Sequence, residues 1–154
     1  MTAKIMKGIA TALGVILSVS GCAAMPIGRE QISTDDAPAA IGPYAQAVRV
    51  GGTIYLSGQI ALDPSTAKMV SGGIDEQTHR VLRNIRSVLR AAGFSMRDVV
   101  QSQVFLSDLE DYAAMNAVYA SYFEEDPPAR AAVQVARLPR DALVEIMVTA
   151  TRSE

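Results

Sequence analysis

Cysteine, histidine and tryptophan are almost missing from this sequence of 154 residues, which has one Cys, one His and no Trp. The single cysteine, Cys22, excludes an intramolecular disulfide and disfavours a cysteine-based metal cluster. His79 has no second histidine with which to share a metal ion. The P-loop, GxGxxG and HExxH patterns are also missing. Disulfide, metal and nucleotide chemistry are therefore all disfavoured.

The sequence also lacks a large excess of either charge. Its formal net charge is −2, and it becomes about −4 when Lys4 and Lys7, which belong to a separate leader, are left out. A mildly acidic domain has no long-range attraction for nucleic acid. Hydrophobic residues make up 49% of the chain and charged residues 19%, values typical of a globular protein. The length predicts one domain after the leader.

The beginning of the chain differs in composition from the rest. Lys4 and Lys7 precede an apolar run, Gly8 to Val19, of roughly a dozen residues, which is too short for a stable membrane-spanning helix. Small residues then lead to Cys22. This order resembles a bacterial lipobox, so we expect residues 1–21 to be a lipoprotein signal peptide and Cys22 to be the lipidation site.

Residues near Cys22 bear on where such a protein would reside. Ala23 follows Cys22, and the absence of Asp at that position favours, by resemblance to other lipoproteins, the periplasmic face of the outer membrane. An ordinary secretory signal and a buried helix are alternatives, and translation from Met25 would give a cytoplasmic protein. On the preferred interpretation, residues 22–32 are a lipid-anchored tether and residues 33–154 form the folded domain.

Periodicity predicts the elements of this domain. The expected strands are 47–50 and 53–58, paired through Gly51-Gly52, then 99–106, 131–135 and 143–151, and the expected helices are 74–92 and 109–123. We therefore assign an α+β fold, a single mixed β-sheet with both helices packed on one face. Tyr112 and Tyr119 of the second helix are interpreted as core residues. Strand 143–151 is apolar on both sides, so the second face of the sheet is expected to be buried in an oligomer.

The stretch from Asp126 to Ile146 carries the first candidate functional residues. Arg130 stands at the start of one expected strand and Glu145 within the next, with a turn-like sequence at residues 138–141 between them. Strands joined by a tight turn pair antiparallel, so we expect Arg130 and Glu145 to lie close together. A guanidinium beside a carboxylate in a strongly apolar strand predicts a small-molecule site.

Short motifs follow one another along the domain. They are Ile41-Gly42-Pro43-Tyr44, Ser57-Gly58-Gln59, Asn116-Ala117-Val118-Tyr119, Pro128-Ala129-Arg130, Ala136-Arg137-Leu138-Pro139 and Val144-Glu145-Ile146. None is specific alone, but the ordered set resembles the RidA (YjgF) family of reactive-intermediate deaminases over residues from about 33 to 152.

This resemblance implies a chorismate-mutase-like fold assembled as a homotrimer, with three active sites in clefts between subunits. Members of the family that deaminate hydrolyse imines and enamines, such as 2-aminoacrylate, to a 2-oxo acid and ammonia, without a metal or organic cofactor. The implied ligand is therefore a small 2-imino or enamine carboxylate. The alternative is a non-catalytic, small-carboxylate-binding or chaperone-like trimer on the same scaffold. A ribonuclease role is disfavoured by the acidic charge.

The resemblance also assigns the two candidate catalytic residues. Arg130 would hold the substrate carboxylate through paired hydrogen bonds. Glu145 would orient or deprotonate the attacking water. For Glu145 the alternative is a structural ion pair with Arg130 or Arg137.

Four further positions are candidate substrate-binding residues. Tyr44 and Asn116 match family positions that line and polarise the cleft, and Ser57 matches one that hydrogen-bonds substrate or water. Position 132, often Cys or Thr in the family, is Ala132 here, so only a contact through its backbone is retained. An exported member would also need a source of imine other than the cytosolic enzymes that form 2-aminoacrylate.

Overall fold

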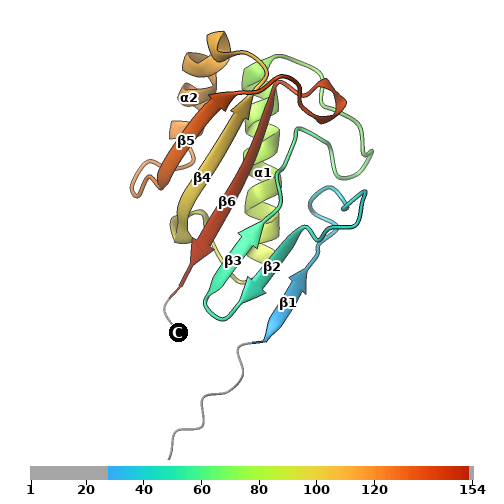
Figure 1. The fold of residues 1–154 in the computed structure, drawn as a ribbon, viewed down its shortest axis with the longest axis vertical. Coiled ribbons are helices and arrows are strands. Elements are labelled where there is room, and N and C mark those ends of the chain that lie inside the picture. Colours follow the sequence, from blue (N-terminus) through green and yellow to red (C-terminus); the bar gives the residue numbers. More distant parts are fainter. Residues whose placement is uncertain (1–27, 153–154) are drawn as a thin grey trace, which may run out of the picture.

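The computed structural model describes residues 28–152, which form one mixed sheet and two α-helices (Figure 1). The sheet has six strands in the order β1-β2-β3-β6-β4-β5. In chain order the elements are β1 (Arg29–Ile32), β2 (Ala47–Val50), β3 (Thr53–Leu56), α1 (Ile74–Ala91), β4 (Val99–Leu106), α2 (Tyr112–Ala120), β5 (Ala129–Gln134) and β6 (Val144–Thr151), with 3-10 turns at Met96–Asp98, Leu109–Asp111 and Pro139–Asp141. No helix in this range has the length and apolar character that a membrane crossing requires.

The hairpin of β2 and β3 confirms the sequence prediction. The two strands pair antiparallel, with Val50 opposite Thr53. Gly51, between them, has a positive φ of 56°, a conformation that glycine adopts without the steric cost of a Cβ atom. After β3 the chain leaves regular strand structure, and Gln59 and Leu62 form only isolated bridges.

Helix α1 also follows its predicted bounds. The Glu76 carboxylate accepts a hydrogen bond from the Gly73 N–H at 2.8 Å, which caps the first turn, and Gly93, with φ of 79°, ends the helix. Its fully buried apolar residues are Val81, Leu82, Ile85, Val88 and Leu89. Burial of each such side chain contributes about 1.5–3 kcal/mol, so packing against the sheet explains the helical periodicity.

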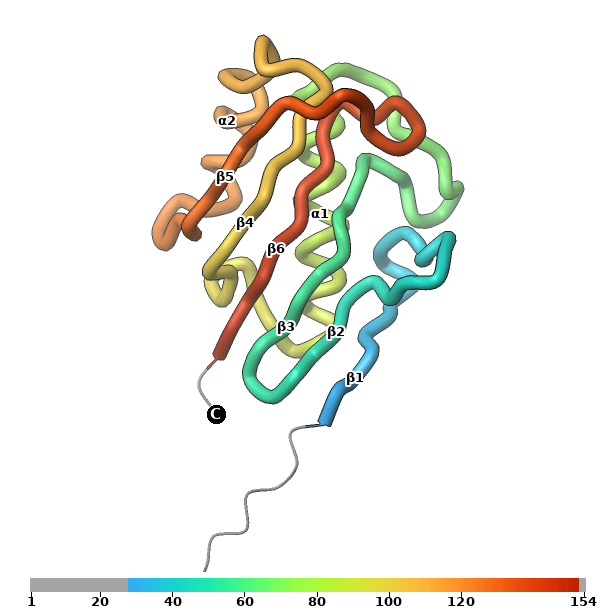
Figure 2. Tube along the Cα trace, viewed as in Figure 1, coloured from blue at the N-terminus to red at the C-terminus, as the bar shows by residue number. Residues whose placement is uncertain are grey.

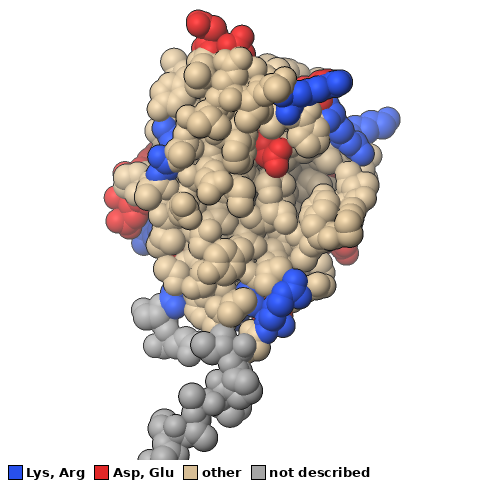
Figure 3. All heavy atoms as spheres, viewed as in Figure 1, with Lys and Arg blue, Asp and Glu red and all other residues tan. Residues whose placement is uncertain are grey.

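The two helices cover one face of the sheet and leave the other face open (Figure 1). Along β6, Val144, Ile146 and Val148 are buried, whereas Glu145 and Met147, which point to the open face, are only partly buried. The space-filling view shows an open face that carries charge mainly at its rim, with an acidic group near the middle beside a hollow (Figure 3). The predicted arrangement, a mixed sheet with both helices on one face, is confirmed.

The pairing of the last two strands differs from the sequence prediction. β5 is parallel to β4, and β6 lies between β3 and β4 and is antiparallel to both (Figure 2). The chain leaving β5 passes the end of β4, where the Val135 N–H donates to the Leu106 carbonyl at 2.9 Å. The expected hairpin of strands 131–135 and 143–151 is therefore wrong, because β4 occupies the place between them.

The first strand lies in a segment that the sequence analysis expected to be a tether. β1 pairs antiparallel with β2 at the edge of the sheet, with Ile32 opposite Ala47. Ile32 is buried, but the three residues before it are exposed. Polar residues of this kind are common on edge strands, which is why Arg29-Glu30-Gln31 gave no strand signal. The predicted signal peptide and Cys22 lie outside the described residues.

Candidate active site

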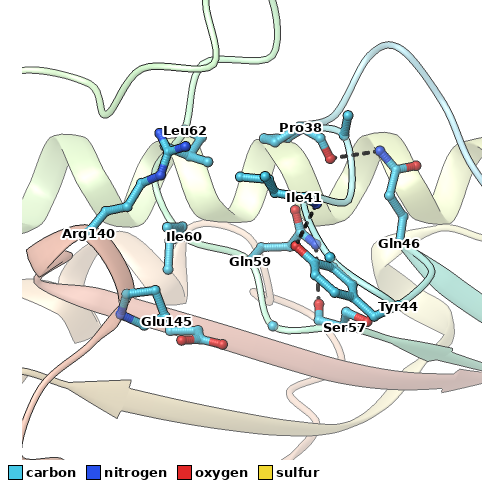
Figure 4. Close-up of a pocket in the computed structure, with 14 residues that line it drawn as sticks. Pro38, Ile41, Tyr44, Gln46, Ser57, Gln59, Ile60, Leu62, Arg140 and Glu145 are labelled. Carbon is cyan, nitrogen blue, oxygen red and sulfur yellow. Dashed lines mark hydrogen bonds between the residues drawn. The ribbon is translucent and has the colours of Figure 1, made fainter.

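A cavity of about 490 Å³ lies where four segments of the chain meet. Its walls are the loop 38–44, the segment 57–62 after β3, the turn at Pro139-Arg140, and Glu145 of β6 (Figure 4). Three of the predicted site residues, Tyr44, Ser57 and Glu145, line this cavity. The fold therefore brings together three residues that are far apart in the sequence.

The side chain of Glu145 points into this cavity (Figure 4). Partial burial raises the pKa of its carboxyl group above the ordinary value, because desolvation disfavours the charged form. None of the ion pairs formed among residues 28–152 includes Glu145. A carboxyl group with a raised pKa beside an accessible cavity suits a general base that also returns its proton.

The loop that carries Tyr44 is held by one buried side chain, Gln46. The Gln46 amide nitrogen donates to the carbonyl oxygens of Thr34, Ala37 and Pro38 at 3.0, 3.2 and 2.8 Å, and its Oε1 accepts from the Thr34 N–H at 2.7 Å. These bonds satisfy buried polar groups of the loop. The position of Tyr44 therefore depends on a residue that sequence reasoning did not single out.

Tyr44 and Ser57 present different hydrogen-bonding groups to the cavity. The Tyr44 hydroxyl accepts from the Ile41 N–H at 3.3 Å, which leaves its own proton available to a ligand. The Ser57 hydroxyl donates to the Ala45 carbonyl at 2.7 Å, which leaves its oxygen free to accept. Tyr44 thus offers a donor and Ser57 an acceptor.

Arg130 and Asn116 lie in a second cluster, between α2 and β5. The guanidinium carbon of Arg130 is 4.5 Å from the centre of the Tyr119 ring and 5.8 Å from that of Tyr112, distances typical of cation–π contacts. Arg130 Nη2 also donates to the Tyr112 hydroxyl at 3.3 Å. Hydrogen bonding with Asn116, and then the charge of Arg130, lower the pKa of Tyr112. The Arg130 guanidinium is therefore oriented while its other N–H groups remain able to bind an anion.

Arg130 and Glu145 lie on opposite faces of the sheet. Arg130 is beside Ser102 in the pairing of β4 and β5, and Ser102 is opposite Val148 on the buried, helix-covered face. Glu145 is opposite Phe105. Because successive side chains of a strand alternate between faces, Glu145 and Phe105 lie on the open face. The expected close approach of Arg130 and Glu145 within one chain is therefore wrong. Within one chain, the predicted site residues therefore fall into two separate clusters.

The other predicted residues fall as follows. Ala132, two residues after Arg130 on β5, packs against the core. Arg137 pairs with Asp141, with Nε and Oδ1 2.7 Å apart, so it is not the structural partner of Glu145 that the alternative required. Cys22 lies outside the described residues.

Besides Gln46, two residues of these clusters, Tyr112 and Arg140, had been missed or assigned differently. Tyr112 was expected in the core, yet it is 40% exposed, whereas Tyr119 is buried as expected. The four-residue spacing of Tyr112 and Asn116 places both on one side of α2, and that spacing was the available signal. Arg140 lines the cavity and donates through Nη1 to the Ala67 carbonyl at 2.9 Å. No sequence pattern marks that contact.

Known proteins similar to this chain match nearly all of its described residues. The Endoribonuclease L-PSP family matches residues 34–152. The 2-iminobutanoate/2-iminopropanoate deaminase of Mus musculus is 49% identical over 124 residues, which are 80% of this chain and 92% of the relative. A RutC family protein of Pyrococcus horikoshii is 51% identical over 118 residues, which are 77% of this chain and 94% of the relative.

Solved structures share the fold. RidA from the Antarctic bacterium Psychrobacter has a TM-score of 0.77 and 46% identity, covering 80% of this chain and 99% of that chain. TdcF of E. coli with bound serine has a TM-score of 0.78 and 41% identity, again covering 80% of this chain and 99% of that chain. These matches confirm the fold class and the resemblance drawn from the sequence motifs. The chain therefore belongs to the Endoribonuclease L-PSP family, together with its RutC and RidA relatives.

Proposed function

We propose that this chain is a hydrolase that deaminates small 2-imino or enamine carboxylates to 2-oxo acids and ammonia. The observation that carries this proposal is the Glu145 carboxyl group, which lies in a cavity with Tyr44 and Ser57 and has a raised pKa. The mouse and human relatives named 2-iminobutanoate/2-iminopropanoate deaminase, 49% and 48% identical, support the same reaction type.

In the proposed reaction Glu145 acts first as a base and then as an acid. The ionised carboxylate takes a proton from water while the water oxygen bonds to the iminium carbon, which gives a carbinolamine. Glu145 then returns the proton to the amine nitrogen. As the C–N bond breaks, the hydroxyl proton passes to the Glu145 carboxylate. The leaving ammonia then takes up this proton, so the products are a 2-oxo acid and ammonium and Glu145 is ionised again. A raised pKa favours the return step, since the protonated carboxyl group is then more accessible near neutral pH.

Arg130 supplies recognition of the substrate carboxylate in this proposal. A guanidinium binds a carboxylate through two parallel hydrogen bonds. Because the Arg130 and Glu145 of one chain face opposite sides of the sheet, we assign each complete site to two copies of the chain. One copy supplies Tyr44, Ser57 and Glu145, and the next supplies Asn116, Arg130 and the backbone at Ala132.

The open face of the sheet supports such an assembly. Tyr55 and Val133 are 53% and 45% exposed, and Phe105 and Met147 between them are partly exposed. An apolar surface of this kind is commonly buried between subunits. We propose a homotrimer, and light scattering coupled to size-exclusion chromatography measures the mass that tests it.

Turnover is tested directly by adding the purified protein to an amino-acid oxidase or a dehydratase that forms 2-iminobutyrate or 2-aminoacrylate in situ. We expect the imine to disappear faster and ammonia to be released in equal amount. Saturable binding without ammonia release would instead support the non-catalytic alternative. A folded protein that neither binds nor turns over the imine contradicts the proposal.

The assignment of each site to two copies has its own test. Arg130→Ala and Glu145→Gln oligomers are prepared separately, dissociated, mixed in equal amounts and reassembled. A site regains both groups only when each copy contributes its intact half, so about a quarter of the wild-type activity should return. Mixed oligomers of normal size with no regained activity would show that the two groups do not serve one site in this way.

We also propose that the exported protein is a lipoprotein, with residues 1–21 removed and Cys22 lipidated at the periplasmic face of the envelope. The support is the order of charged, apolar and small residues before Cys22. Growth with radiolabelled palmitate should label the wild-type protein in the membrane fraction and should not label Cys22→Ser. An unlabelled product that begins at Met25 would contradict export.

A further inference from the structure

Gly58 lies two residues after the end of β3, in the wall of the cavity, and directly against the Glu145 carboxylate. A Cβ atom added at position 58 would be 1.9 Å from Glu145 Oε1, 2.8 Å from its Cδ and 3.1 Å from its Cγ. These distances are shorter than any normal van der Waals contact, so no side chain at position 58 is compatible with the observed position of the carboxylate.

The need for glycine here is one of space and not of backbone conformation. Gly72 offers a contrast, since its Cβ would also meet a carboxylate, that of Glu76 at 2.7 Å, but its φ is +119°, a conformation that disfavours L-residues. Gly58 has no such positive φ. Alanine at position 58 is therefore compatible with the backbone and conflicts only with Glu145.

The backbone around Gly58 is held on both sides, so it cannot retreat from an added methyl group. The Ser57 N–H donates to the Gln46 carbonyl at 3.0 Å. On the other side, the Gln59 N–H donates to the Ile146 carbonyl at 2.9 Å, and the Ile146 N–H donates to the Gln59 carbonyl at 3.1 Å. The end of the flexible Glu145 side chain is the part that is free to move.

We propose that Gly58 is a positioning residue of the proposed hydrolase, whose missing side chain provides the space in which the Glu145 carboxylate faces the substrate. This inference rests on the proposed function for the role of Glu145, but the geometry at Gly58 stands without it. An added methyl group moves the carboxylate out of this space towards solvent. Catalysis then loses both the position of the base and the partial burial of its carboxyl group.

The first test is Gly58→Ala in the otherwise wild-type chain. We expect kcat to fall by about tenfold to a hundredfold, as for a catalytic group displaced by about 1 Å, with a smaller change in KM and no loss of thermal stability. Gly28→Ala is the matched control, because a Cβ atom there meets nothing within 4 Å. An unchanged kcat for Gly58→Ala would overturn the proposal.

A pH profile separates positioning from a general structural effect. The Glu145 carboxyl group gains solvent in Gly58→Ala, so its pKa falls towards the ordinary value. The acid limb of kcat/KM should therefore move to lower pH. The other ionisable groups of the proposed site, Tyr44 and Arg140 of the same copy and Arg130 of the next copy, are present in both proteins. An acid limb that stays in place would contradict the proposed displacement.

A double variant tests whether Gly58 acts through Glu145. Glu145→Asp moves the carboxylate back along the side chain, away from the 1.9 Å contact. We expect the fold-loss in kcat for Glu145→Asp to be smaller in the Gly58→Ala background than in the wild type. If the fold-loss in kcat of the double variant equals the product of the fold-losses of the two single variants, the two positions act independently.

Titration of the carboxyl group by carbon-13 NMR separates failure of this inference from failure of the proposed function. The Glu145 pKa should fall in Gly58→Ala and remain unchanged in Gly28→Ala, whether or not an imine is turned over. A protein without deaminase activity but with this pKa change would reject the function and retain the role of Gly58. An active deaminase in which Gly58→Ala leaves the Glu145 pKa unchanged would retain the proposed function and reject the role of Gly58.

Discussion

The Glu145 half and the Arg130 half of the proposed site hold their charged groups by opposite means. Glu145 occupies space left by a glycine and is partly buried, with no ion-pair partner among residues 28–152. Arg130 is held by contacts, with the Tyr119 ring at 4.5 Å and the Tyr112 hydroxyl at 3.3 Å. The first arrangement destabilises the ionised form of the group, and the second orients a group for recognition. Changes to the two halves should therefore affect different kinetic constants.

The largest effect is expected from Glu145→Gln. The amide neither accepts nor returns a proton, so kcat should fall by about 10²–10⁴, the usual contribution of general acid–base catalysis, while KM changes little. Steady-state rates of imine loss measure this, with the exposed Glu30→Gln as the control. A kcat equal to that of the wild type would remove Glu145 from the mechanism.

Arg130→Ala should act mainly on substrate binding. Hydrogen bonds to a charged group contribute about 1.5–3 kcal/mol, so kcat/KM should fall by about tenfold to a hundredfold, chiefly through a higher KM, and turnover should fall as well. Arg137→Ala is the control, because Arg137 pairs with Asp141 away from this cluster. Equal kinetic constants for Arg130→Ala and wild type would show that the carboxylate is bound elsewhere.

Tyr119 should have a smaller effect, which depends on its ring and not on its hydroxyl. The hydroxyl is buried near Ser102 and makes no hydrogen bond of normal geometry among the described residues, so Tyr119→Phe should keep the KM and the melting temperature. Tyr119→Leu removes a cation–π contact of about 0.5–2 kcal/mol and should raise the KM severalfold. A similar KM for the two variants would show that the ring does not orient Arg130.

The smallest effect is expected on stability. Burial raises the pKa of Glu145 in the folded state, so the folded state binds its proton more tightly than the unfolded chain. Stability therefore falls as the pH rises through the interval between the unfolded and folded pKa values and stays lower above it. Glu145→Gln should melt at a higher temperature than the wild type at neutral pH and at a similar temperature below both pKa values. A lower melting temperature at neutral pH would contradict this sign.

Local features of the fold could be predicted from the sequence because local interactions determine them. The Gly51-Gly52 turn, the apolar stripe from Val81 to Leu89 and the end of α1 at Gly93 all lie where periodicity and turn chemistry place them. Strand order is different. Nothing between Arg130 and Glu145 in sequence indicates that β6 inserts between β3 and β4, since tertiary packing decides that order.

Three of the predicted site residues lie together in one cavity, but the face of the sheet on which Arg130 lies was not predicted. The motifs with Tyr44, Ser57 and Glu145 identified three lining residues of one cavity. To predict that Arg130 lies on the helix-covered face, the register of β5 against β4 must be known. A shift of one residue in that register would move every side chain of β5 to the other face of the sheet. The contact between Gly58 and Glu145 joins two distant segments and has no local signal.

The position of β6 in the sheet has a consequence for folding during synthesis. β6 comes after every other strand in chain order, yet it lies in the middle of the sheet and joins the half made by β1, β2 and β3 to the half made by β4 and β5. During synthesis the earlier strands therefore emerge with unpaired inner edges, and unpaired strand edges are prone to aggregate. The strand that covers those edges also carries Glu145, so the same segment that completes the sheet completes the cavity.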